Sequence, residues 1–70
     1  MAHVRAPITG VVWQVLVAEG DAVAVEQTVI VLESMKLEIP VESESAGTVR
    51  RILVAEGDAV TEDQVLLDLD

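Results

Sequence analysis

Cysteine, phenylalanine and tyrosine are absent from the sequence, and tryptophan, histidine and lysine occur once each. Without cysteine, neither a disulfide nor a thiolate metal site can stabilise the chain. Its 70 residues suffice for one small domain, so residues 1–70 are predicted to form a single domain. Stability must then come from aliphatic packing. Valine, isoleucine and leucine make up 25 of the 70 residues, a composition that favours strands over helices.

Positive charge is also scarce, and the formal net charge is −9 at pH 7. Nucleic acid and anionic membrane surfaces are therefore not expected as partners, because both are bound through clustered lysine and arginine. No apolar run approaches the length of a bilayer span. The N-terminal residues lack a signal-peptide pattern, so we expect a cytoplasmic location. No Pro/Ala-rich or Gly/Ser-rich linker is present, which leads us to expect a complete, free-standing chain.

The chain contains an internal repeat. Residues 10–33 recur as residues 47–70 with 12 identities in 24 positions, and residues 16–23 recur unchanged as 53–60. Each copy has the pattern strand, Gly-Asp turn, strand. Neither copy could bury its apolar face alone, so we predict two sheets packed on one core around a pseudo-twofold axis. No segment has the 3.6-residue spacing and caps of a helix.

Within each copy, the apolar alternation shifts phase at the same place. This shift falls at Trp13-Gln14 and at the equivalent Arg50-Arg51. It predicts a β-bulge in each copy, because one extra residue returns the following side chains to the core face. Since Trp13 aligns with Arg50, its side chain is expected to lie at least partly outside the core.

The single lysine, Lys36, lies in the connector between the two copies. The expected strands 28–33 and 37–42 are close enough to form a hairpin, which places Lys36 at its tip. Such a tip is exposed and rigid, so it presents one amine to another protein for acylation. Met35 and Leu37 beside it offer adaptable apolar surface of the kind that a modifying enzyme can recognise. An ordinary solvated lysine is the alternative.

These residues resemble the biotinyl/lipoyl attachment domain family, over nearly the whole chain. The resemblance is carried by Ala6-Pro7 with Gly10-Val11-Val12, Gly20-Asp21-Ala22-Val23, Glu33-Ser34-Met35-Lys36, Gly47-Thr48-Val49 and Gly57-Asp58-Ala59-Val60. It implies an all-β fold, a flattened β-barrel or sandwich of two four-stranded antiparallel sheets with internal pseudo-twofold symmetry. It also implies that Lys36 carries a prosthetic group in amide linkage.

The residues beside Lys36 indicate which group the resemblance implies. Biotinyl members usually have Met-Lys-Met, whereas lipoyl members usually have Asp-Lys-Ala. Met35 matches the biotinyl pattern, and Leu37 keeps the apolar character and approximate volume of the second methionine. Biotin is therefore the expected cofactor, and lipoate is the alternative. Within the family, the chain is most similar to small stand-alone proteins of the biotin carboxyl carrier type.

By this resemblance, the protein is expected to be a carrier without catalysis of its own. A biotin protein ligase would load Lys36, and a biotin carboxylase and a carboxyltransferase would exchange a carboxyl group through it. Met35, Leu37, Glu33 and Glu38 are the candidate residues for ligase recognition, the glutamates through charge complementarity. The alternatives are a lipoyl carrier that shuttles acyl groups, and an unmodified β module that binds partners through the exposed hairpin.

The sequence also leads to predictions for His3, Glu26 and Asp63. His3 is expected to be solvated near a frayed end, and no metal or catalytic site is predicted around it. Glu26 and Asp63 stand where family members often have glycine. If those turns require positive φ, Glu26 carries strain that Asp63 partly avoids.

Overall fold

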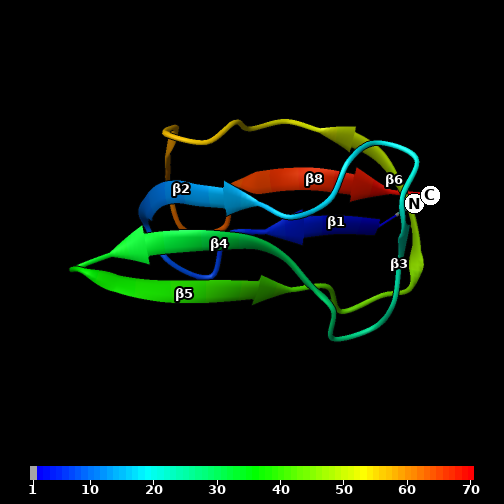
Figure 1. Ribbon diagram of the computed structural model, residues 1–70, viewed down its shortest axis with the longest axis horizontal. Helices are drawn as coiled ribbons and strands as arrows, with labels where there is room; N and C mark the ends of the chain where they lie inside the picture. Colours follow the sequence, from blue (N-terminus) through cyan, green and yellow to red (C-terminus); the bar gives the residue numbers. More distant parts are fainter. Residues whose placement is uncertain (1) are drawn as a thin grey trace.

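Residues 2–70, the part of the chain that the computed structural model describes, form eight strands and no helix; Met1 lies outside this part. The strands are β1 (Ala2–Arg5), β2 (Gly10–Val15), β3 (Ala22–Val23), β4 (Thr28–Ser34), β5 (Leu37–Glu42), β6 (Gly47–Ile52), β7 (Ala59–Val60) and β8 (Val65–Leu69). They make two four-stranded sheets, ordered β1-β8-β6-β3 and β5-β4-β2-β7 (Figure 1). The predicted all-β class and the two four-stranded antiparallel sheets are confirmed. No helix of residues 2–70 is long and apolar enough to cross a bilayer.

The repeat offset of 37 residues relates the two sheets strand by strand. It superimposes β2 on β6, β3 on β7, β4 on β8, and β1 on the second part of β5. Backbone hydrogen bonds repeat as well: Gly20 N–H donates to the Val49 carbonyl, and Gly57 N–H donates to the Val12 carbonyl, both at 2.8 Å. Both bonds join one copy to the other, and each sheet contains strands from both copies. The copies therefore interlock rather than packing as two separate halves.

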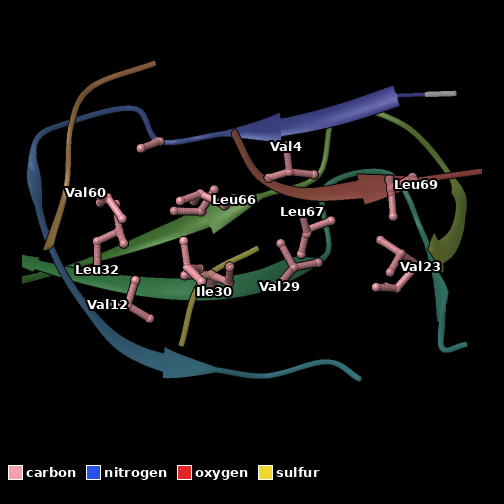
Figure 2. Packing of buried hydrophobic residues seen from close by; sticks show 14 residues of the cluster. Val4, Val12, Val23, Val29, Ile30, Leu32, Val60, Leu66, Leu67 and Leu69 are labelled. Carbon is pink, nitrogen blue, oxygen red and sulfur yellow. The ribbon is translucent and has the colours of Figure 1, made fainter. Parts of the chain in front are cut away.

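The core lies between the sheets and is filled by aliphatic side chains from equivalent positions of the two copies. Ile30 and Leu32 on β4 are fully buried, as are their equivalents Leu67 and Leu69 on β8. Figure 2 shows these side chains spread along the core, with Leu66 near Ile30 and Val23 near Leu69. Burying each such side chain contributes about 1.5–3 kcal/mol. Because β4 contributes to this core along its length, the hairpin that follows it has a fixed base.

The predicted bulges occur in both copies. The register of β2 against β4 shifts between Val12 and Gln14, and that of β6 against β8 shifts between Val49 and Arg51. Trp13 is the extra residue in β2 and is 43% exposed, as predicted. In each strand the bulge turns the residues after it, so that the inward face stays apolar on both sides of the irregularity.

The turns that lack glycine have the expected conformation. Glu26 has φ of 68° and Asp63 has φ of 74°. Each backbone N–H donates to a segment that precedes or joins the copies, Glu26 to the Ser43 carbonyl at 2.7 Å and Asp63 to the Ala6 carbonyl at 2.8 Å. These bonds hold both residues in the left-handed backbone region, which glycine enters more easily. Because aspartate tolerates this region better than glutamate, Glu26 carries the larger strain of the two.

Of the two expectations for His3, solvent exposure is confirmed, since its side chain is 43% exposed, but the frayed end was wrong. His3 lies in β1, directly opposite Asp68 of β8, and its Nδ1 lies 2.6 Å from Asp68 Oδ1. The Asp68 side chain is only 9% exposed, and Arg51 Nη2 lies 3.9 Å from its other oxygen. A buried carboxylate needs donors, and an ionised one can only accept, so His3 Nδ1–H donates to it. The interaction joins residues 65 positions apart, a pairing that local sequence patterns do not reveal.

Candidate functional site

The β4–β5 hairpin ends in a two-residue loop. β4 and β5 pair in antiparallel register down to Ser34 opposite Leu37, which leaves only Met35 and Lys36 to reverse the chain. In Figure 1 the hairpin forms one extremity of the molecule, and the start of β1 and the end of β8 lie at the other. Lys36 thus occupies the tip at which the sequence placed it, and Met35 shares the loop with it.

This loop has a backbone conformation that its residues do not favour. Met35 has φ of 54° and Lys36 has φ of 66°. Two consecutive positive φ values are what a type I′ hairpin loop requires, and Asn-Gly is the pair that fits it best. A residue with a longer side chain costs about 1–2 kcal/mol in the left-handed region. Strain of this kind, kept at an exposed tip, indicates that the side chains serve function rather than folding.

The side chains around the tip are open to solvent. Met35 is 87% exposed and Leu37 is 65% exposed, so neither adds appreciably to the core. Lys36 is exposed as well. Among residues 2–70, no side chain forms a hydrogen bond or ion pair with that of Lys36. The amine is therefore free for reaction, with apolar surface on both sides of it.

Glu33 and Glu38 stand directly opposite each other at the base of the loop. Both are exposed, and within the described residues neither carboxylate takes part in an ion pair. Like charges directly across two strands are destabilising by a few tenths of a kcal/mol or more. The hairpin thus presents two uncompensated negative charges below the lysine, a feature that a positively charged partner surface could use.

Gly10 supports the hairpin from the adjacent strand, a role that the sequence analysis did not assign. A Cβ at Gly10 would lie 2.5 Å from the carbonyl oxygen of Glu33. Only glycine allows β2 to approach β4 this closely at the hairpin base. The equivalent Gly47 would meet the carbonyl oxygen of Asp70 in the same way. The signal was present in the repeat, since glycine begins both copies.

The geometry fits a covalently carried group. One primary amine projects from a rigid, narrow tip, and no other part of the described chain pairs with it. A group linked to that amine could enter the active site of another protein while the two sheets stayed outside. Of the predicted site residues, the structure brings Glu33, Met35, Lys36, Leu37 and Glu38 together within one hairpin.

Residues 2–69 match the family model described as "Biotin-requiring enzyme". The chain belongs to this family. The match spans both copies of the repeat and the hairpin between them, so the predicted family resemblance is confirmed. It also supports biotin as the cofactor that the family requires.

The chain is similar in sequence to segments of known proteins. The chain is 51% identical over 43 residues to a putative urea carboxylase of Emericella nidulans, over 61% of this chain and 4% of that protein. It is 53% identical over 38 residues to the Biotinylated protein TB7.3 homolog of Mycolicibacterium smegmatis, over 54% of each chain. The matched segment thus spans about half of the second relative and a small part of the first.

A solved structure supports the same fold. The crystal structure of the Kluyveromyces lactis urea carboxylase matches with a TM-score of 0.92 and 30% sequence identity. The match covers 99% of this chain and 6% of that one. These 70 residues therefore have the same fold as the matching region of that protein.

Proposed function

We propose that this protein is a biotin carrier and that Lys36 is the residue to which biotin is attached in amide linkage. The observation that carries the proposal is the tip itself: the only lysine occupies a strained two-residue loop, and its side chain is exposed and has no partner among residues 2–70. A loop selected for stability alone would have asparagine and glycine there. Membership of a biotin-requiring family supports biotin as the attached group.

In the loading step, Lys36 acts as a nucleophile toward biotin that a biotin protein ligase has activated as its adenylate. The Lys36 nitrogen bonds to the activated carboxyl carbon, AMP leaves, and the amine gives up a proton. Met35 and Leu37 give the ligase apolar surface on both sides of the amine, and Glu33 and Glu38 give it two negative charges to recognise. The chain positions the amine and contributes no catalytic group.

Once attached, biotin supplies the ring that carries a carboxyl group between a biotin carboxylase and a carboxyltransferase. The carrier keeps this group at high local concentration near both enzymes, so it need not dissociate between them. The rigid base of the hairpin contributes by fixing the point from which the lysine stem swings. The named carboxylases among the similar proteins support a partner of this type.

The first prediction concerns the attachment residue. Incubation with a biotin protein ligase, biotin and MgATP should add one biotin to the protein, and Lys36→Arg should abolish the addition, because arginine keeps the charge but is not acylated. Intact mass measures the adduct, and peptide fragmentation locates it. A biotin found on the α-amino group, or an unmodified parent protein, would contradict the assignment. A lipoyl adduct formed by a lipoate ligase in place of biotin would support the lipoyl alternative.

The second prediction concerns the strain at the tip. Replacing the loop by its best-fitting pair, Met35→Asn with Lys36→Gly, should raise the free energy of unfolding by about 1–2 kcal/mol, because both positive φ values become easier to adopt. Urea denaturation measures this change. The same variant should accept no biotin. A variant no more stable than the parent would show that the loop is not strained, while leaving the attachment of biotin to Lys36 open to the first test.

A further inference from the structure

The sheet that bears the hairpin turns an apolar face to solvent. Val11, Trp13, Val31 and Pro40 alternate along β2, β4 and β5 with residues that point into the core, and together we call them the apolar face. Val31 lies between Gln14 and Pro40 in the sheet register. Val11 is 42% exposed and Trp13 is 43% exposed. These side chains therefore leave apolar area uncovered on one side of a small molecule.

The repeat provides an internal control for this face. At the equivalent positions, the opposite sheet has Thr48, Arg50, Asp68 and His3. The same backbone positions in the same molecule thus accept polar and charged side chains. The fold does not require apolar residues there, so folding alone does not explain the apolar face.

The charges divide between the sheets in the same way. The strands of the hairpin-bearing sheet contain three carboxylates, Glu33, Glu38 and Glu42, and neither lysine nor arginine, a sum of −3. The strands of the opposite sheet contain Arg5, Arg50, Arg51 and Asp68, a sum of 3 − 1 = +2 with histidine neutral. The surface that complements the first sheet is apolar at its centre and basic at its edge. The opposite sheet of a second copy would offer basic residues but a polar centre, where His3 and Asp68 pair, and two chains of net charge −9 repel each other, so a second copy fits this surface poorly.

The apolar face continues into the proposed attachment site. Val11 lies opposite Glu33, one residue before Ser34, the last paired residue of β4 ahead of the loop that holds Lys36. Before biotin is attached, Lys36 has only its own four-carbon stem to reach an activated carboxyl group. The body of the carrier must then come close to the loading enzyme, whereas the longer biotinylated arm relaxes this need in later steps.

We propose that the apolar face is the docking surface for the biotin protein ligase, which would meet it with an apolar patch bordered by lysine and arginine. The proposal rests on the function proposed above, and it adds a second contact region outside the residues that flank Lys36. Trp13 is its central contact, since a partly buried aromatic side chain can exclude water over a large area on binding.

The test uses residues that the chain itself has on the other sheet. Val11→Thr with Trp13→Arg copies positions 48 and 50, and Val11→Thr alone is a milder variant. Initial rates of biotin addition are measured against carrier concentration with a biotin protein ligase, biotin and MgATP. We expect kcat/KM of the double variant to fall by roughly tenfold or more, with kcat at saturating carrier nearly unchanged, because docking weakens while the lysine is untouched. Raising the salt concentration should lower kcat/KM of the parent, because the docking charges are screened.

The control is Leu53→Gln, which removes a side chain of similar exposure, 45%, that follows β6 of the opposite sheet. It should be loaded like the parent, and circular dichroism and thermal melting check that every variant is folded. If the parent accepts biotin on Lys36 and the folded variants load with unchanged kcat/KM, the docking proposal is overturned and the attachment site stands. If the parent accepts no biotin at all, the proposed function itself fails. A loss of kcat without a change in KM would also overturn the docking proposal.

Discussion

The two sheets share a core but differ at the centres of their outer faces. On β8 the central residue is Asp68, whose carboxylate is held by His3 and lies near Arg51. On β4 the equivalent residue is Val31, and proline stands opposite it where β1 has histidine. The centre of the outer face is thus a hydrogen-bonded polar cluster on the sheet that contains β8, and a pair of apolar residues on the sheet that contains β4.

Packing of the core restricts the inward residues of the two sheets, whereas their outward residues are free to differ. Inward positions are alike in both copies, as Ile30 and Leu67 illustrate, because both copies fill one aliphatic core. Outward positions differ, although the strands pair in equivalent registers. A buried aspartate needs hydrogen-bond donors and a valine does not. His3 therefore has a structural role beside Asp68, whereas the equivalent Pro40 has no such role beside Val31.

Among substitutions that test this difference between the sheets, His3→Ala is expected to change the free energy of unfolding most. It removes the donor 2.6 Å from Asp68 and leaves the carboxylate with Arg51 at 3.9 Å, so the free energy of unfolding should fall by about 1–3 kcal/mol. Pro40→Ala at the equivalent place in the other sheet should change stability by less than about 0.5 kcal/mol. Urea denaturation of both variants measures the difference. Equal losses would show that the two faces do not differ in the way described.

A smaller effect is expected from Asp68→Val, which copies the residue of the other sheet. Replacing a buried charge with an apolar side chain of similar volume is often neutral or stabilising, so the free energy of unfolding should change by no more than about 1 kcal/mol. In this background His3→Ala should become nearly neutral. A double-mutant cycle then yields a coupling of about 1 kcal/mol or more between His3 and Asp68. Additive losses would mean that the two side chains do not support each other.

The smallest effect is expected at the equivalent turns. Glu26→Gly should stabilise the protein by a few tenths to about 1 kcal/mol, because glycine adopts positive φ without steric cost. Asp63→Gly should stabilise it less, since aspartate tolerates that region better than glutamate. The shift in melting temperature measures both changes. A larger gain at Asp63 than at Glu26 would reverse the order of strain inferred from the side chains.

Much of the fold could be predicted because it depends on local or repeated patterns. The two copies, the phase shift at Trp13 and the turn before Gln27 all leave signals within a few residues. The hairpin at Lys36 left such a signal too, since two strand patterns meet there. Its strain did not, because the position of Met35 inside the loop depends on the register that β4 and β5 adopt against the core.

By itself, the sequence determined the strand-forming composition, the duplication and the position of its one lysine between two strands, since these follow from residue type and spacing. Only the tertiary structure decided which strands from the two copies share a sheet, how closely β2 approaches β4 at Gly10, and that Asp68 takes a hydrogen bond from His3. Those features depend on contacts between residues far apart in the chain, whose distances are set when both copies close on one core. The same closure collects one set of outward side chains into an apolar face beside the hairpin.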